Sequence, residues 1–307
     1  MALDDPDLVV IDGDILEDPA PTEPLAERHR RWLPGRGGRP YFSGTVLALF
    51  VVAGAIGPYV TPYDPEEIDL INSLSPPVFA GGTSAHLLGT DQLGRDVLSR
   101  LIDGARVSLL VSLAVVVLAG FIGVAVALAA GYLKGRVDSF LMRTTDANMA
   151  FPALLLAIVI VGVFGPSTRN VIIVLVFAGW PQYARVLRSE VLSLSTRDFV
   201  TMSNVMGAGP WWIIRRHLLP NIASTLLVLA SLQVGLAIIA EGSLSFLGIG
   251  VPPPAPSWGG MLSEGRQYLG QAWWLPILPG IALSATVLAA NMMGDWIRVH
   301  NDPTTRR

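Results

Sequence analysis

The sequence contains no cysteine and a single lysine, Lys134, among its 307 residues. Without cysteine the chain can form no disulfide and offers no thiolate as a nucleophile or metal ligand. The phosphate-binding loop of many ATPases requires the pattern Gly-x-x-x-x-Gly-Lys-Ser/Thr. Lys134 lies in GYLKGR, where no Ser or Thr follows it. The sequence therefore argues against an ATPase site of this type in the chain.

Other catalytic patterns are also missing. The sequence contains neither His-Glu-x-x-His nor Gly-x-Ser-x-Gly, the patterns of many zinc proteases and serine hydrolases. Its four histidines, His29, His86, His217 and His300, do not have the spacing of metal ligands. We therefore expect a protein that is not an enzyme and that holds no cofactor or metal of its own.

Charge is scarce along the chain. Only 15% of the residues are charged and 51% are hydrophobic, whereas about 25% are charged in an ordinary soluble domain. No basic domain is present that would suit a nucleic acid. A chain of this composition is solvated by lipid if its apolar runs reach ~20 residues, the length of a helix that crosses a bilayer.

The sequence contains six long apolar runs. They lie at roughly 43–60, 107–132, 147–165, 170–187, 222–246 and 275–297. The fourth run is the weakest, because Arg169 and Arg185 limit its uncharged part. We predict an all-α membrane protein with six transmembrane helices.

The distribution of Lys and Arg predicts the orientation of these helices. With the N-terminus inside, the inner segments hold sixteen of the 21 basic residues. Cytoplasmic loops carry the excess of Lys and Arg, so both termini and the loop after the fourth run are expected in the cytoplasm. The other five lie in the outer segments: Arg95, Arg100, Arg106, Arg169 and Arg266.

The chain divides into a tail, one membrane domain and a short end. Residues 1–40 are acidic and then rich in Arg and Pro, and we expect a mostly disordered cytoplasmic tail. Residues 41–303 are expected to form the transmembrane domain, with an outer segment at 61–104 and a cytoplasmic loop at 188–221. Residues 304–307 end the chain in the cytoplasm.

The outer segment contains a possible amphipathic helix. Leu93, Val97 and Leu101 would share one face, and Asp96 and Arg100 would pair at i, i+4. Such a helix would lie on the membrane or meet an outer partner.

The cytoplasmic loop contains DFVTMSNVMGAGPWWIIRRHLLPN at 198–221. We predict a short helix capped by Thr196, with Asp198 in its first turn, because that charge is favourable at a helix N-terminus. Gly207 would end this helix in a left-handed turn, and Gly209-Pro210 would begin a second one. Three apolar side chains would share one face of the first helix: Phe199, Met202 and Met206.

Two interpretations of this apolar face remain open on physical grounds. The helix would either rest on the lipid surface or dock into a soluble cytoplasmic partner and transmit movement to the spans. Its place between two spans suits both.

The loop resembles the EAA loop of ATP-binding-cassette importer permeases, which has a Gly followed by an Ile-x-x-x-x-Leu-Pro ending. The matching residues here are Gly207 and the run from Ile214 to Leu219-Pro220. HLLGTDQLGRDVLSRLIDGARVSL at 86–109, EGSLSFLGIGVPPPAPSWGGMLSEGR at 241–266 and NMMGDWIRVHNDP at 291–303 resemble the dipeptide, oligopeptide and nickel permease group. The resemblance covers roughly residues 41–303 and suits the second-subunit (C-type) permease best.

This resemblance implies a type I importer permease in the plasma (inner) membrane of a prokaryote. Its implied partners are a second permease, two ATP-binding-cassette ATPase domains that bind ATP and Mg²⁺, an extracytoplasmic substrate-binding protein and membrane lipid. Peptide is preferred as the substrate because no His, Cys or Met cluster faces the predicted pathway. Nickel or another small solute is the alternative.

The resemblance also implies which residues would couple the chain to the ATPases. The sequence departs from the family where Thr201, Met202 and Ser203 align with Glu-Ala-Ala, so the usual carboxylate is missing. The implied coupling residues are Asp198, Phe199, Met202, Met206, Gly207 and Ala208.

A few polar residues lie within the predicted spans. Such residues either line a pathway or pack helices together, and for Glu241 the structural role, capping a turn in EGSLS, is preferred. An ion-coupled secondary transporter would need a relay of ionisable groups, and beyond Glu241 the spans have none. The candidates for pathway or structural roles are Glu241, Asn148, Gln233, Asn291 and Asp295.

Overall fold

The structure is a computed structural model that describes residues 8–11, 14–17 and 41–301. The chain separates into two units, residues 1–39 and 40–307. In the first unit, strands β1 (Leu8–Ile11) and β2 (Asp14–Glu17) pair antiparallel, with Leu8 opposite Glu17. The rest of the expected tail, like residues 304–307, lies outside the described residues.

The second unit is helical. Its shorter elements are three 3-10 turns, at Leu70–Asn72, Val78–Ala80 and Arg266–Tyr268, and a π-helical turn at Ile214–Leu218. The α-helices are α2 (Tyr41–Val60), α3 (Val97–Leu133), α4 (Gly135–Ala150), α5 (Ala153–Phe164), α6 (Thr168–Leu194), α7 (Asp198–Val205), α8 (Pro210–Ile213), α9 (Leu219–Phe246), α10 (Trp258–Gly265) and α11 (Trp274–Asn301).

Four helical segments of the described chain are long and apolar enough to cross a membrane: Val97–Leu133, Thr168–Leu194, Pro210–Phe246 and Trp274–His300. They confirm the second, fourth, fifth and sixth apolar runs as helices of spanning length. The fourth run therefore tolerates its flanking arginines. The first run lies in α2, where the described apolar stretch is the shorter Ser43–Gly57.

The third run was expected to form one transmembrane helix at 147–165, and that expectation was wrong. The run belongs to two helices, α4 and α5, which are bent by 80° and make a fifth crossing only if they count together. The break falls at Phe151, whose backbone is extended (φ −86°, ψ 124°). Pro152 explains the break, because a proline disfavours the helical conformation in the residue before it.

The centre of the bundle is the close contact of α3 with α6. Gly123 allows this approach, because a Cβ at that position would lie only 2.3 Å from Cβ of Tyr183. At Gly131 a Cβ would meet Val191 at 2.7 Å. Small residues at such positions let two membrane helices pack backbone to backbone.

The remaining spans pack around this pair. α2 crosses α3 where Gly54 lies against Arg106 and Gly57 against Ile102, and its beginning meets α11 at Met293. α4 lies beside α6, joined by ion pairs of Arg185 to Asp146 (2.6 Å) and Arg188 to Asp138.

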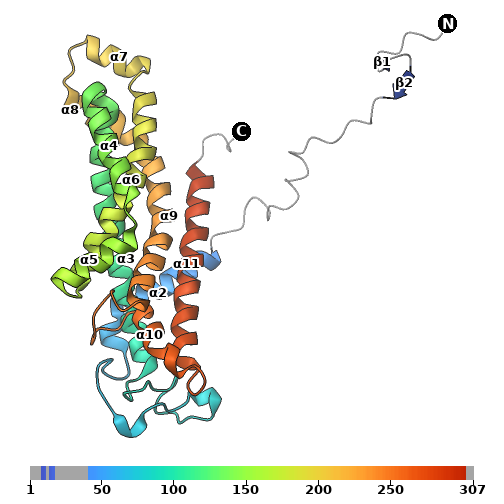
Figure 1. Ribbon diagram of the computed structural model, residues 1–307, viewed down its shortest axis with the longest axis vertical. Coiled ribbons are helices and arrows are strands. Elements are labelled where there is room, and N and C mark those ends of the chain that lie inside the picture. The colour runs from blue at the N-terminus through green and yellow to red at the C-terminus, as the bar shows by residue number, and fades with distance from the viewer. Residues whose placement is uncertain (1–7, 12–13, 18–40, 302–307) are drawn as a thin grey trace. The chain divides into compact units, whose positions relative to one another are not determined.

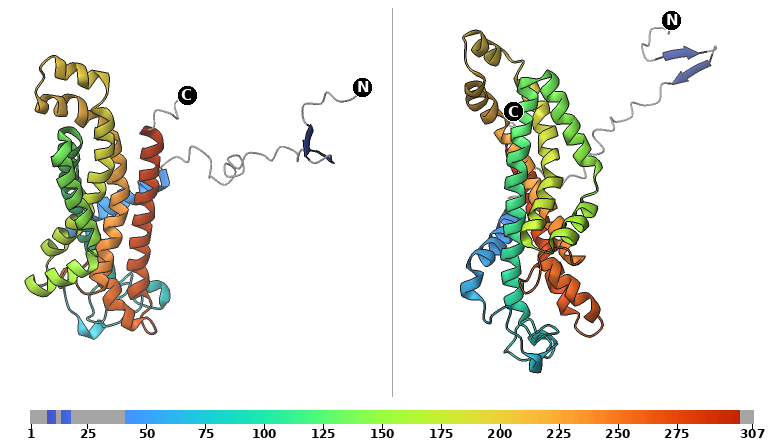
Figure 2. Two further views of the ribbon diagram at one scale, coloured as in Figure 1. Left: turned by 45° about the horizontal axis from the view of Figure 1, so that its top comes forward. Right: turned by 60° about the vertical axis from the view of Figure 1, so that its left-hand side comes forward.

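The second unit has two distinct ends (Figure 1). One end carries α7, α8, the junction of α3 with α4, and the last turns of α11. The opposite end carries the loop after α2, α10 and the start of α11. Both views in Figure 2 show the same separation.

Candidate functional site

The N-cap of α7 lies one residue later than expected. Arg197 occupies the N-cap position and makes no side-chain capping bond, so the expected cap by Thr196 was wrong. The Thr196 hydroxyl instead donates to the Ser193 carbonyl (2.9 Å). Asp198 is exposed in the first turn of α7, as expected.

The end of α7 follows the expected pattern. Gly207 has φ +81°, the left-handed conformation that glycine adopts without steric cost. The Ala208 amide donates to the Ser203 carbonyl (3.0 Å) and closes the turn. Gly209 then caps α8, with Pro210 in its first position. The predicted left-handed turn and the predicted helix start are confirmed.

One face of α7 is attached to the spans. Val200 is fully buried in the core that also contains Ile213 and Leu218. The hydroxyl of Tyr132, at the end of α3, donates to the side-chain oxygen of Asn204 (3.2 Å). This face links α7 to both α3 and the beginning of the fifth span.

His217 makes the second attachment. Its Nε2 lies 3.2 Å from the Ser203 hydroxyl. Its ring contacts those of Phe199 and Trp212, with centroid distances of 5.4 Å and 5.1 Å. These contacts pack α7 against α8 and the π-helical turn.

The π-helical turn makes α8 continuous with the span. The Leu219 amide donates to the Ile214 carbonyl, five residues earlier. Pro220 follows directly, and a proline inside a helix lacks an N–H and crowds the carbonyl four residues before it. The wider turn accommodates Pro220 without ending the helix.

The opposite face of α7 is apolar and exposed. Met202 is 65% exposed and Met206 is 85% exposed, whereas Phe199, at 38%, is partly covered by His217. Val205 and Trp211, which the sequence reasoning did not include, extend the exposed surface. We name Met202, Val205, Met206 and Trp211 the α7 surface.

Glu241 lies inside α9 and is fully buried. The expectation that Glu241 caps a turn was wrong, because the helix continues to Phe246. The Ser245 hydroxyl donates to Glu241 Oε1 (2.8 Å) and accepts the Val251 amide (3.2 Å). Ser245 is therefore the residue that ties the following loop to the helix.

Three other candidates lie on α4 and α11. Asn148 is buried at the end of α4. Asn291, on α11, packs against α9, because a Cβ on Gly235 would lie 2.5 Å from its side-chain oxygen. Asp295 is exposed, one turn beyond Asn291. The structure does not bring these side chains together into one site.

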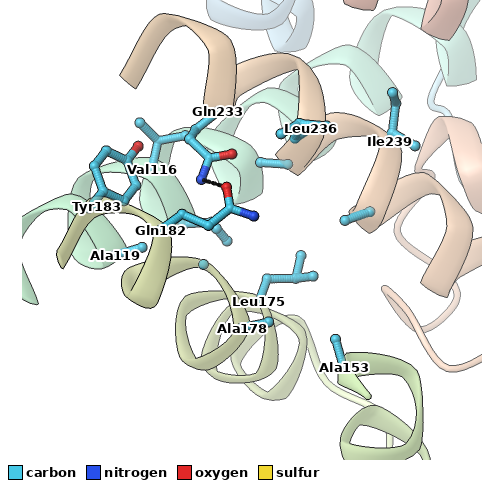
Figure 3. A pocket seen from close by; sticks show the side chains of 14 residues that line it. Val116, Ala119, Ala153, Leu175, Ala178, Gln182, Tyr183, Gln233, Leu236 and Ile239 are labelled. Carbon is cyan, nitrogen blue, oxygen red and sulfur yellow. Dashed lines mark hydrogen bonds between the residues drawn. The ribbon is translucent and has the colours of Figure 1, made fainter. Parts of the chain in front are cut away.

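Gln233 is the candidate that lines a cavity. The cavity measures about 370 Å³ and lies between α3, α6 and α9, with Ala153 of α5 at one side (Figure 3). Gln233 Nε2 donates to Oε1 of Gln182 on α6 (2.8 Å). The remaining lining is apolar apart from Tyr183, whose hydroxyl is buried without a partner in the described chain.

The end opposite α7 contains a cluster of buried charges. Arg95 donates to Asp91 (2.6 Å) and to Glu264 of α10 (2.7 Å), and Arg100 donates to Glu264 (3.0 Å). Asp91, Arg95 and Arg100 are each at least 95% buried. The cluster joins the loop before α3 to α10, and we name Asp91, Arg95, Arg100 and Glu264 the outer charge cluster.

The expected outer helix with an Asp96–Arg100 pair was wrong. Asp96 instead caps α3 by accepting the Ser99 amide (2.8 Å), and Val97 begins that helix. Asp96 also contacts His86 Nδ1 (3.0 Å). Earlier in the same loop, the Asn72 side chain donates to Asp69, which lowers the pKa of the Asp69 carboxyl.

The sequence reasoning missed Gln182, Tyr183 and the outer charge cluster. Gln182 carried a usable signal, since it is an amide inside an apolar run next to a helix-interior proline, Pro181. The pairing of Arg95 with Glu264 carried no such signal, because 169 residues separate the partners. Within residues 41–300, no group of three His, Asp or Glu side chains is arranged to hold a metal ion.

Known proteins with the same features fall into one group. A family model described as "Binding-protein-dependent transport system inner membrane component" matches residues 107–307. The dipeptide transport system permease protein DppC of Escherichia coli K12 is 43% identical over 97% of this chain and 99% of its own length. The di/tripeptide transport system permease protein DppC of Pseudomonas aeruginosa is 41% identical over 91% and 92%.

A solved structure has the same fold. The chain is similar to a chain of the MetNI methionine ABC transporter in an inward-facing conformation, with a TM-score of 0.51 and 20% identity. The similarity covers 66% of this chain and 96% of that one. The family model and the two relatives show that the chain belongs to the family of binding-protein-dependent transport system inner membrane components, the permeases of ABC importers.

Proposed function

We propose that this chain is the C-type permease subunit of an ATP-driven importer of dipeptides or oligopeptides. The observation that carries the proposal is the identity of 41–43%, over more than nine tenths of the chain, to permeases of dipeptide and di/tripeptide transport. In this proposal residues 41–303 form half of the translocation path, and a second permease forms the other half.

The complete complex would have six crossings in this chain and both of its termini in the cytoplasm. The bent pair α4–α5 and the short α2 would supply the two crossings beyond the four long helices. The arrangement of the ends supports this orientation. The α3–α4 junction, α7 and the last turns of α11, which are predicted to be cytoplasmic, lie at one end (Figure 1).

The α7 surface would be the docking site for a cytoplasmic ATPase. Its apolar side chains are exposed, while the opposite face of α7 is attached to α3 and to the fifth span. Movement of a docked ATPase would therefore pass directly into two spans. Asp198, Phe199, Met202, Met206, Gly207 and Ala208 would form or orient this contact.

The other partners follow from the same proposal. ATP and Mg²⁺ would bind to the ATPases, and an extracytoplasmic binding protein would deliver the peptide to the end that carries the outer charge cluster. The chain purified alone should hydrolyse no ATP. Sustained hydrolysis by the pure chain would contradict its assignment as a permease.

Uptake by the reconstituted complex tests the proposal. Proteoliposomes are prepared with this chain, a partner permease, the ATPases and the binding protein. They should transport labelled dialanine when ATP is supplied on the side of the membrane that carries the ATPases. Omission of this chain should abolish uptake. Uptake of Ni²⁺ but not of peptide would favour the alternative solute, and uptake driven by an ion gradient without ATP would favour a secondary transporter.

Cysteine labelling tests the orientation independently, because the chain has no native cysteine. Thr196→Cys, next to α7, should be protected from an impermeant thiol reagent in intact cells. Ser84→Cys, in the loop before α3, should react. Both positions are exposed, so both should react in permeabilised cells. Labelling of Thr196→Cys from outside would contradict the proposed orientation.

A further inference from the structure

The cavity between α3, α6 and α9 contains a pair of side-chain amides. Each carboxamide has two N–H donors and one carbonyl acceptor, and the pair uses one of each in the bond from Gln233 to Gln182. In the described chain, Gln182 Nε2 and Gln233 Oε1 make no other hydrogen bond. Exchange of O and N in both side chains would leave the same kinds of group free, an NH₂ group on one side chain and a carbonyl on the other.

The free N–H and carbonyl groups belong to two residues that line an apolar, partly open cavity. Among the described residues none that lines the cavity is charged, and its walls are formed by side chains such as Val116, Leu175, Leu236 and Ile239 (Figure 3). Gln182 is exposed and Gln233 is half-buried, so a ligand can reach both amides. A ligand that displaces water from the apolar walls would strengthen a hydrogen bond made there. The volume of about 370 Å³ lies in the range of sites for small ligands, about 300–1,000 Å³.

We propose that Gln182 and Gln233 bind the backbone of the transported peptide in this cavity. The free N–H of the pair donates to a peptide carbonyl, and the free carbonyl of the pair accepts from a peptide N–H. Every peptide carries these two groups whatever its side chains are. The absence of charged lining residues means that this site does not select for the peptide's terminal charges. The inference rests on the proposed peptide import.

Substrates with a blocked backbone N–H test this contact. Uptake of dialanine and of its N-methylated analogue, which lacks the N–H of the peptide bond, is measured in proteoliposomes with the same binding protein throughout. The ratio of the two rates is compared between the wild type and variants, so the selectivity of the binding protein cancels. The variants are Gln182→Leu, Gln233→Leu and the double variant. The double variant is needed because either amide left alone still offers an N–H and a carbonyl.

The double variant should transport dialanine about tenfold more slowly than the wild type, as expected for the loss of one or two neutral hydrogen bonds. Its preference for dialanine over the N-methylated analogue should fall toward that of the binding protein alone. Ser231→Ala is the matched control. It removes a hydroxyl from the same helix, one that donates to Val228 and lies outside the cavity lining, and it should keep the wild-type preference.

The outcomes separate this inference from the proposed function. Dialanine uptake by the wild type together with an unchanged preference in the double variant would overturn the role of the amide pair and leave peptide import standing. Absence of dialanine uptake in the wild-type complex would overturn both. Peptide-stimulated ATP hydrolysis that survives in the double variant would show that the complex still assembles, so that a lost preference belongs to the contact with peptide.

Discussion

The outer charge cluster and the α7 surface, at opposite ends of the membrane unit, differ in how their side chains are covered. At the outer charge cluster, Asp91, Arg95 and Arg100 are buried, and each has a partner of opposite charge within the chain. At the other end, the α7 surface leaves large apolar side chains exposed. Buried charges are tolerated only when they are paired, and the outer charge cluster pairs its charges within this chain. Exposed apolar surface is stabilised only when something covers it, so the other end calls for a partner.

The anchoring of α7 supports the same contrast. Its inner face uses a buried valine, a tyrosine hydroxyl and a histidine in contact with two aromatic rings. These contacts fix the helix while leaving its methionines free. A helix that only covered the end of the bundle would bury its apolar residues there. Four variants break or sharpen the contrast between the two ends.

The largest effect is expected from Asp91→Ala at the outer charge cluster. This change removes the carboxylate that accepts from Arg95 and lies 3.5 Å from Arg100 Nε. Two buried guanidinium groups would then depend on Glu264 alone. Breaking a buried ion pair costs about 3–5 kcal/mol, measurable as a lower midpoint of thermal unfolding in detergent. Glu67→Ala, an exposed acid of the same loop, should leave the midpoint unchanged, and an equal effect of the two changes would contradict the importance of the cluster.

The next effect is expected from the double change Met202→Asp, Met206→Asp on the α7 surface. Burial of a large apolar side chain contributes about 1.5–3 kcal/mol, so the loss of both contacts should weaken ATPase association by a hundredfold or more, at about 1.4 kcal/mol per tenfold change. Both side chains are mostly exposed, so the amount of folded permease should not change. The measurement is co-purification of the ATPases at matched permease levels.

A lipid-resting α7 would behave differently under the same change. Association with the ATPases would then stay at the wild-type level, while the attachment of this end to the membrane would weaken. Val200→Asp serves as the reference for misfolding, because Val200 is fully buried. Recovery of the ATPases at wild-type levels with the double variant would contradict the docking role of the α7 surface.

A smaller effect is expected from Gly207→Ala. No atom lies within 4 Å of a Cβ built at Gly207, so the cost comes only from its positive φ. A non-glycine residue in the left-handed region costs about 1–2 kcal/mol, and the turn that directs α7 should loosen accordingly. Peptide uptake should therefore fall more than ATPase association does.

Gly209→Ala is the matched control for that turn. Gly209 is two residues away, is equally free of neighbours and has φ −68°. It should leave uptake and stability close to the wild type. Equal effects of the two changes would mean that the left-handed conformation of Gly207 has no special role.

The smallest effect is expected from Thr201→Glu, which restores the carboxylate that the loop lacks relative to its family. Thr201 is exposed, and its hydroxyl donates only to the Arg197 carbonyl one turn earlier (3.3 Å). A solvent-exposed ion pair contributes about 0–1 kcal/mol, so ATPase association should strengthen by no more than about fivefold. A loss of association on restoring the glutamate would mean that the docking groove has adapted to a neutral residue.

Local rules allowed much of the membrane unit to be predicted from the sequence. Apolar run length located the spans of α3, α6, α9 and α11, because the thickness of a bilayer sets the length of a helix that crosses it. Glycine at 207 and proline at 210 predicted the end of α7 and the start of α8, because their backbone preferences are properties of single residues. The apolar face of α7 followed from the helical period.

The predicted Asp96–Arg100 pair was wrong because each side chain had more than one possible partner. Arg100 had a carboxylate four residues earlier, at Asp96, but it pairs with Glu264, and Asp96 caps the helix instead. Both arrangements satisfy local rules, and α10 decides between them by bringing Glu264 to the two arginines. The bend between α4 and α5 is a different kind of miss, because Pro152 explains it locally and apolar run length alone does not register it.

The sequence by itself determined which segments are helical, where α7 ends and that the chain carries no phosphate-binding loop, since each depends on residues close together in the chain. Only the tertiary structure decided that Gln182 meets Gln233 in an uncharged cavity and that Arg95 meets Glu264 under α10. These contacts join residues separated by 51 and 169 positions. They form because close packing of α3 on α6, allowed by glycines such as Gly123, sets where the neighbouring helices and their polar side chains lie.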